Sequence, residues 1–281
     1  MTTIDSQLMG AEYEVRLSRL PLRGAAQIAV VFWIYALYGA FRNLATGPAA
    51  VARNNAEAVL AAERVLHLGF ERSLQHLALH WSWVVTLCST VYSGTHLVVP
   101  LLVLVLLYRR TPARYAVWRD TFLVLLGLAL VAFAVFPLMP PRLMPSSYHF
   151  ADTSHVFTIS RGPLRDALGG KADPTQLDVW QFSNPYAAMP SLHATWALWA
   201  CLAAWPVVHR RWVKALLVAY PPAMAVSVVV TANHWVLDVV VGGAMLAAAY
   251  GVARAIDELR ARRLGWLRPR PQVAVGEVRS V

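Results

Sequence analysis

Charged residues are scarce in this sequence. They make up 14% of the 281 residues, and hydrophobic residues make up 58%. A soluble domain has about 25% charged residues. The composition therefore excludes an ordinary soluble protein and predicts an integral membrane protein, with the bilayer as its surroundings.

Cysteine is also scarce, and no compact basic patch is present. Cys88 and Cys201 both fall inside apolar runs, which excludes a disulfide framework and favours packing in the core. The formal net charge is +10, but the basic residues lie between apolar runs and not among surface aromatics. This distribution is typical of membrane topology, and we expect no nucleic-acid partner.

Apolar runs predict an all-α, polytopic membrane protein with six transmembrane helices. The six runs cover residues 25–41, 84–108, 121–138, 194–208, 215–230 and 235–253, and the first is about long enough to cross a bilayer. The first run lacks a convincing cleavage site after it and is interpreted as a retained span, not a signal peptide. We divide the chain into an N-terminal segment (1–24), a six-span catalytic membrane domain (25–257) and a basic tail (258–281).

Two segments between the spans have a different pattern. In 54–79, charged and apolar residues alternate at roughly helical spacing, which predicts an amphipathic helix lying on the bilayer surface. The segment 139–189 is rich in proline and glycine, which predicts a structured loop.

The basic residues also predict the orientation in the cell membrane. With six spans, 17 of the 25 Lys and Arg residues fall on one side, before residue 25, in 109–120, in 209–214 and after residue 253. The positive-inside rule makes that side cytoplasmic, together with both termini. The 139–189 loop and the starts of the fourth and sixth runs then lie on the extracytoplasmic side.

Two short polar signatures lie at the starts of these runs. The first is Pro190, Ser191, Leu192 and His193, where a loop gives way to an apolar run. Proline suits the first helical turn, and the free amides of Ser191, Leu192 and His193 at a helix N-terminus form an anion site. His193 adds a side chain that acts as an acid or a base near neutrality.

The second signature is His234 followed four residues later by Asp238, so both lie on one helix face. Asp238 can accept a hydrogen bond from one imidazole nitrogen, which fixes the tautomer and leaves the other nitrogen as a nucleophile. Arg142, after the third run, can offer a planar fork to phosphate oxygens. Together these residues are what phosphoryl transfer through a phosphohistidine needs.

Simpler interpretations exist for each residue. His193 alone would satisfy a loop carbonyl, His234 and Asp238 would form a structural pair, and Arg142 would anchor the interface. A zinc site on the two histidines and Asp238 is a further alternative, but a helix N-terminus and Arg142 suit an anion better than a cation. We therefore expect neither a metal nor another cofactor.

The two signatures resemble the second and third signatures of the type 2 phosphatidic acid phosphatase superfamily, over roughly residues 131–243. The resemblance implies that His234 is the nucleophile, Asp238 its partner and His193 the acid for the leaving group. It also implies that Arg142 and Ser191 bind phosphate. A phosphatase acting on a lipid phosphate ester is the function it favours.

Two positions depart from the common family pattern. Val135 stands where a lysine is expected, and Val228 where an arginine is expected. The form of the signatures looks closer to the branch that includes inositol phosphorylceramide synthases, which transfer a phospho-head-group to an alcohol. Hydrolysis and transfer to an alcohol therefore both stay open, as do the identity of the lipid or phospholipid and the oligomeric state.

A non-catalytic lipid-phosphate carrier is a third alternative, which the intact trio of His193, His234 and Asp238 disfavours. Further candidate substrate contacts in the loop are Asn184, Tyr186, Arg161 and Arg165.

Overall fold

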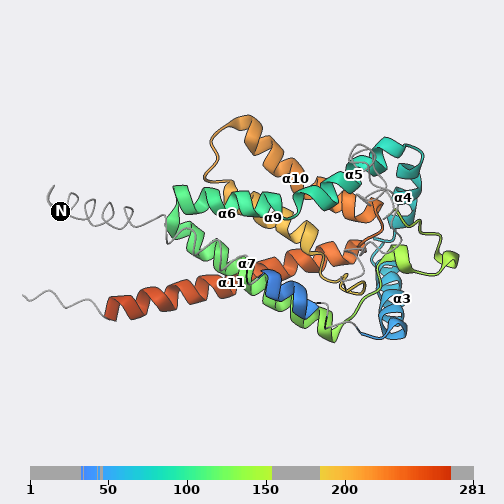
Figure 1. Cartoon of the computed structure of the whole chain (residues 1–281), viewed down its shortest axis with the longest axis horizontal. Coiled ribbons are helices and arrows are strands. Elements are labelled where there is room, and N and C mark those ends of the chain that lie inside the picture. The colour runs from blue at the N-terminus through green and yellow to red at the C-terminus, as the bar shows by residue number, and fades with distance from the viewer. Residues whose placement is uncertain (1–32, 34, 43, 45–46, 154–183, 267–281) are drawn as a thin grey trace, which may run out of the picture.

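A computed structural model describes residues 33, 35–42, 44, 47–153 and 184–266. In that part of the chain the fold is all-helical, as predicted, and Figure 1 shows the helices gathered into one elongated bundle. The α-helices are α3 (Ala49–Val65), α4 (Glu71–Leu79), α5 (Ser82–Thr95), α6 (Val98–Arg110), α7 (Pro112–Val135), α9 (Leu192–Ala204), α10 (Arg211–Val230) and α11 (Val236–Trp266).

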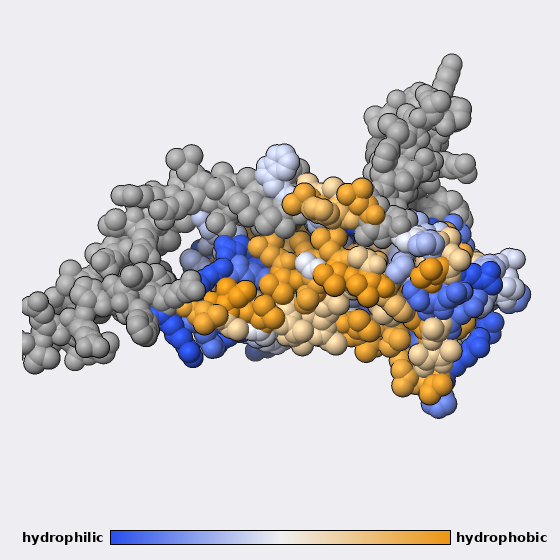
Figure 2. All heavy atoms as spheres, turned by 90° about the horizontal axis from the view of Figure 1, so that it is seen from below, coloured by the Kyte–Doolittle hydropathy of each residue, from blue (hydrophilic) through white to orange (hydrophobic). Residues whose placement is uncertain are grey.

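Three helices are long and apolar enough to cross a membrane, namely α7, α10 and α11. Helices α5 and α6 meet at a 43° bend and qualify together as a fourth, broken span. Figure 2 shows the corresponding surface, a hydrophobic belt between two hydrophilic ends. The chain is therefore a membrane protein, and the predicted single passage through 84–108 corresponds to the bent pair.

The count of six spans stays a prediction. Helix α9 has 13 residues, fewer than the roughly 20 that cross the hydrocarbon core unaided. Most of the run at 25–41 lies outside the described residues, although 35–42 are largely helical. Helices α7 and α10 begin earlier than their apolar runs, and α11 continues to Trp266 into the segment assigned to the tail.

Helix α9 lies inside the bundle and organises its packing. It contacts α6, α7, α10 and α11, and the side chain of Trp199 is fully buried with its Nε1 donating to the Trp118 carbonyl on α7 at 3.1 Å. Burial of such an aromatic ring contributes a few kcal/mol to stability. The packing of α9 against these helices thus also holds its N-terminal end, which carries the first signature.

The prediction of a single amphipathic helix over 54–79 is wrong, while its position on the bilayer surface stays a prediction. The segment forms two helices, α3 and α4, and the chain between them turns at His67, which has a positive φ of 57°. The side chains of Glu63, Glu71 and Gln75 are buried and not solvated. The reason is that the two carboxylates bind backbone amides at the start of α11, a tertiary contact that helical periodicity does not reveal.

The described part of the 139–189 loop covers residues 139–153 and 184–189. It contains two short 3-10 helices, η1 (Pro141–Leu143) and η2 (Ser146–Tyr148), and an isolated parallel bridge joins Leu138 to Ala187. The two ends of the loop are thereby held side by side beneath the starts of α9 and α11.

Candidate active site

The entrance of α9 differs in detail from the sequence prediction. The helix begins at Leu192, so Pro190 precedes the helix and Ser191 is the N-cap, with its Oγ accepting from the Ala194 amide at 3.5 Å. The Ser191 amide is not free, because it donates to the backbone carbonyl of Asp238 at 3.1 Å. Anion binding by the amides of Leu192 and His193, the next two donors of this turn, stays a prediction.

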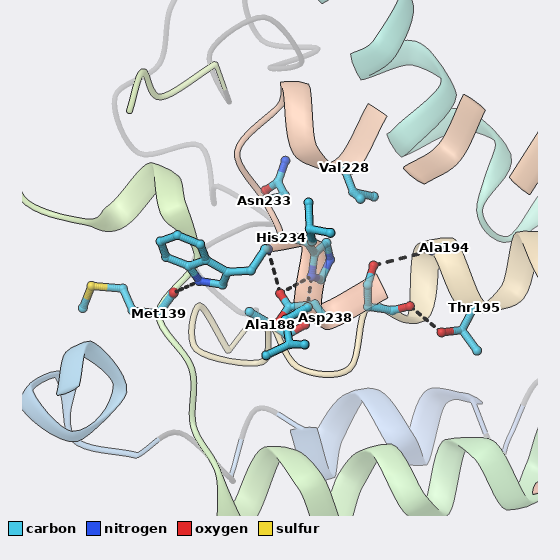
Figure 3. Close-up of polar contacts among 12 residues, drawn as sticks. Met139, Ala188, Ala194, Thr195, Val228, Asn233, His234 and Asp238 are labelled. Atoms are coloured by element: carbon cyan, nitrogen blue, oxygen red, sulfur yellow. Dashed lines mark hydrogen bonds and ion pairs between the residues drawn. The ribbon is translucent and has the colours of Figure 1, made fainter. Parts of the chain in front are cut away.

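A close approach of α11 to α9 brings the two signatures together. A Cβ at Gly242 would collide with the side chain of Thr195 and contact the Ser191 carbonyl. Thr195 in turn donates from Oγ1 to that carbonyl at 2.6 Å (Figure 3). Glycine at this position therefore allows the second turn of α11 to lie against the first turn of α9.

His234 is held in one tautomer. Its Nδ1 lies 2.8 Å from the Ala188 carbonyl and 3.2 Å from Asp238 Oδ2 (Figure 3). Both atoms are acceptors, so Nδ1 must carry the proton and Nε2 keeps its lone pair. Asp238 Oδ2 also accepts from the Trp235 amide at 3.0 Å, which fixes the carboxylate behind the ring. This is the arrangement that a nucleophilic imidazole requires.

His193 lies beside His234 and is surrounded by aromatic rings. The two histidine ring centroids are 5.7 Å apart. The ring of Tyr92 stacks on the ring of His193, with centroids 4.1 Å apart, and the centroid of the His96 ring lies 4.6 Å from that of His193. Tyr92 and His96 both come from the α5–α6 region. Within the described residues, no side-chain hydrogen bond involves His193, so its ring nitrogens are available to a substrate. Tyr92 and His96 were not among the candidates from sequence, since no local spacing links them to either signature.

Arg142 is placed next to the second signature. Its amide donates to the Ala232 carbonyl and its Nε donates to Asn233 Oδ1, both at 2.9 Å. The Asn233 amide group donates in turn to Thr231 Oγ1 at 2.9 Å. Because Nε is occupied by Asn233, the two terminal nitrogens of the guanidinium form the face that is presented to a ligand.

A buried pair of carboxyl groups, Glu63 and Glu71, supports the start of α11. Glu63 Oε1 accepts from the Leu237 amide at 2.7 Å, and Glu71 Oε1 accepts from the Val236 amide at 3.1 Å. Burial, together with a hydrogen bond to Glu71, raises the pKa of Glu63 to about 9, so the pair shares one proton at neutral pH. Three carboxyl groups, these two and Asp238, thus satisfy three consecutive amides at the start of α11.

The remaining sequence candidates have other surroundings. The buried side chain of Asn184 binds backbone, donating to the Arg42 carbonyl and accepting from the Tyr186 amide, each at 2.9 Å. The structure thus joins Asn184 to Arg42 and to Tyr186, and substrate contact by Asn184 or Tyr186 stays a prediction. Arg161 and Arg165 lie outside the described residues.

A family comparison agrees with this geometry. The chain matches the model of the PAP2 superfamily over residues 57–252, which include both signatures and Arg142. The protein is therefore a membrane protein of the PAP2 superfamily. Members of this superfamily are generally phosphatases or phosphotransferases. No curated protein and no solved structure gave a significant match.

Proposed function

We propose that the protein is a membrane phosphatase that hydrolyses a lipid phosphate ester through a phosphohistidine on His234. The observation that carries this proposal is the tautomer of His234, whose Nδ1 faces two acceptors, in a ring whose centroid lies 5.7 Å from that of His193. The helix N-terminus at Leu192 and the guanidinium of Arg142 provide donors for the phosphoryl oxygens.

The proposed reaction has two displacements at phosphorus. His234 Nε2 forms the P–N bond as the P–O bond to the lipid alcohol breaks, and His193 gives its proton to the departing oxygen. Water then attacks the phosphohistidine, His193 takes a proton from that water, and the P–N bond breaks to release inorganic phosphate. Asp238 stabilises the imidazolium character of His234 in both steps.

The expectation that no metal takes part stays a prediction. Across the described residues, no group of three or more His, Cys, Asp and Glu side chains is arranged to hold a metal ion. The Nδ1 face of His234 is already directed at Asp238 and Ala188. Retention of activity in a chelator is the test of this point.

Transfer to an alcohol is the second candidate function. It is favoured by the form of the first signature and by the two valines at positions where the phosphatase pattern has cations. The same phosphohistidine would then be attacked by a lipid or polar alcohol in place of water.

We also propose that the active site faces the extracytoplasmic side of the cell membrane. The polar end of the bundle that carries α3 and α4 also carries the starts of α9 and α11 (Figure 1). The arginine-rich ends of α6 and α11 lie at the opposite end, which the positive-inside rule makes cytoplasmic.

A product assay tests the function and separates its two forms. Purified protein is incubated with a panel of lipid phosphates and phospholipids, with and without added alcohols, and both inorganic phosphate and new phosphoesters are measured. Phosphate release without an alcohol supports hydrolysis, and formation of a phosphoester only with an alcohol supports transfer. If protein with an intact site produces neither from any member of the panel, the proposed chemistry is wrong.

A further inference from the structure

The proposed phosphate site has one side-chain cation from the signature segments, Arg142. The two valines at the positions where the family pattern has cations lie in different surroundings. Val135 is 77% exposed on the outer surface of α7, whereas Val228 is fully buried in an apolar cluster. A second cation for a phosphoryl dianion must come from another element.

Arg42 is a partly buried cation that the signatures do not include. It lies at the end of the helical residues 35–42, ahead of α3. Its Nε atom is inaccessible to solvent and has no hydrogen-bond partner among the described residues. Tyr38, one turn earlier, shares a hydrogen bond with the guanidinium. No salt bridge of Arg42 to a carboxylate occurs in the described part of the chain.

A buried polar nitrogen that lacks a hydrogen bond is costly. Tyr38 binds the guanidinium of Arg42, but the Nε of Arg42 is buried without a hydrogen-bond partner among the described residues. An anion bound beside Arg42 would give this nitrogen an acceptor.

The side chain of Arg42 is within electrostatic reach of His193, one of the two histidines of the proposed site. Its positive charge acts on His193 and on both rings stacked around it, Tyr92 and His96. The charge of Arg142 also acts on Tyr92. Tyr92 is 4.1 Å from His193, so the two guanidinium groups are both within electrostatic reach of the same small region.

The backbone of Arg42 is tied to the entrance of α9. Asn184 donates from its side-chain amide to the Arg42 carbonyl at 2.9 Å. The chain from Asn184 to Ser191 is short and includes Ala188, whose carbonyl orients His234. The position of Arg42 is therefore coupled to the loop that precedes the first signature.

We propose that Arg42 is a second ligand for the phosphoryl group, acting with Arg142. This inference rests on the function proposed above and names an additional binding residue of the same site. Arg42 contacts the oxygens of the phosphoryl group itself, in a lipid phosphate as in free phosphate. Its planar fork offers two donors to two oxygens, which a lysine cannot reproduce.

Binding and turnover measured on the same variants test the proposal. The full chain is compared with Arg42→Gln, Arg42→Lys and, as a control, Arg53→Gln, which removes an exposed arginine paired with Glu57 on α3. Thermal stabilisation by orthovanadate and by inorganic phosphate reports binding without turnover. The KM for a short-chain lipid phosphate reports recognition of the ester.

Arg42→Gln is expected to weaken the binding of vanadate, phosphate and lipid phosphate by a similar factor of about 10- to 100-fold. This factor corresponds to the loss of hydrogen bonds to a charged group. Arg42→Lys is expected to lie between Arg42→Gln and the parent chain, and Arg53→Gln to match the parent. Arg42→Lys keeps the positive charge, so it remains informative if Arg42→Gln fails to fold.

Two results overturn the assignment of Arg42 while leaving the function intact. One is unchanged binding and KM in both Arg42 variants of a protein that hydrolyses lipid phosphates. The other is weakened binding of lipid phosphate alone, which would place Arg42 on a different part of the lipid. If the parent chain binds neither anion and turns over no phosphate ester, the proposed function fails, and the role of Arg42 fails with it.

Discussion

The buried pair of Glu63 and Glu71 gives a quantitative prediction about the nucleophile helix. In Glu63→Ala, the Leu237 amide loses an acceptor that lies 2.7 Å away and stays buried. An unsatisfied buried donor costs about 1–3 kcal/mol. If the loss displaces His234 and destabilises the transition state by this amount, kcat/KM decreases by about 5- to 150-fold.

Glu63→Gln is the conservative variant. Glutamine keeps the carbonyl oxygen that accepts from Leu237, and its amide group replaces the shared proton as the donor to Glu71. We therefore expect activity within about twofold of the parent chain, since the hydrogen bonds are conserved. Changing both residues to glutamine removes the acceptor that each amide group needs, so the loss should exceed the sum of the single effects.

The pH dependence has a definite sign. The folded protein raises the pKa of Glu63 from 4.5 to about 9, so it holds this proton more tightly than the unfolded chain does. The contribution of the proton to stability is complete below about pH 4.5 and is lost as the pH rises through about 9. Glu63→Gln cannot lose a proton and should lack this alkaline decrease.

Thermal unfolding in detergent between pH 5 and pH 9.5, followed by tryptophan fluorescence, measures this effect. Glu258→Gln, which removes an exposed carboxylate from α11, serves as the control and should follow the parent chain. The reasoning is refuted if Glu63→Ala keeps full activity and stability, or if Glu63→Gln loses stability at alkaline pH as steeply as the parent.

Three further predictions concern the site and its orientation. Asp238→Asn should lower kcat by several orders of magnitude by favouring the wrong tautomer of His234, and steady-state kinetics on folded protein that give near-normal rates would contradict this. Arg142→Ala should lower kcat/KM by about 100- to 1,000-fold, with partial recovery in Arg142→Lys; equal rates in the two variants would remove the need for a bidentate fork. A cysteine at Ser146 should react with an impermeant thiol reagent in intact cells and one at Thr111 should not, whereas the reverse labelling would invert the topology.

The sequence was sufficient for the features that depend on local pattern. The contact between His234 and Asp238 was predicted from their four-residue spacing, and the structure shows it. The two residues do not share one helix as predicted, because α11 begins at Val236 and His234 precedes it. The all-helical fold follows from long apolar runs. The break at 96–97 between α5 and α6 was not predicted, because the segment has no formal charge and its polar stretch at 93–96 is short.

Features that depend on tertiary contact could not be read from the chain. The carboxylates of the 54–79 segment have the spacing of a solvated helix face, but two of them are buried because amides of α11 need acceptors. Likewise, Tyr92 and His96 contact His193, and the charge of Arg42 acts on it, only through the packing of helices distant in sequence. The Ser191 amide was expected to bind an anion, yet the approach of α11 gives it the Asp238 carbonyl.

The central claim is that His234 becomes phosphorylated during turnover, and trapping the intermediate tests it most directly. The protein is mixed with a lipid phosphate carrying labelled phosphorus, quenched within milliseconds in alkali, and assayed for protein-bound label that is stable to base and labile to acid. The account predicts such label in the parent chain, more of it in Asp238→Glu if breakdown slows more than formation, and none in His234→Ala. Label of the same kind and amount in folded His234→Ala protein would contradict the account.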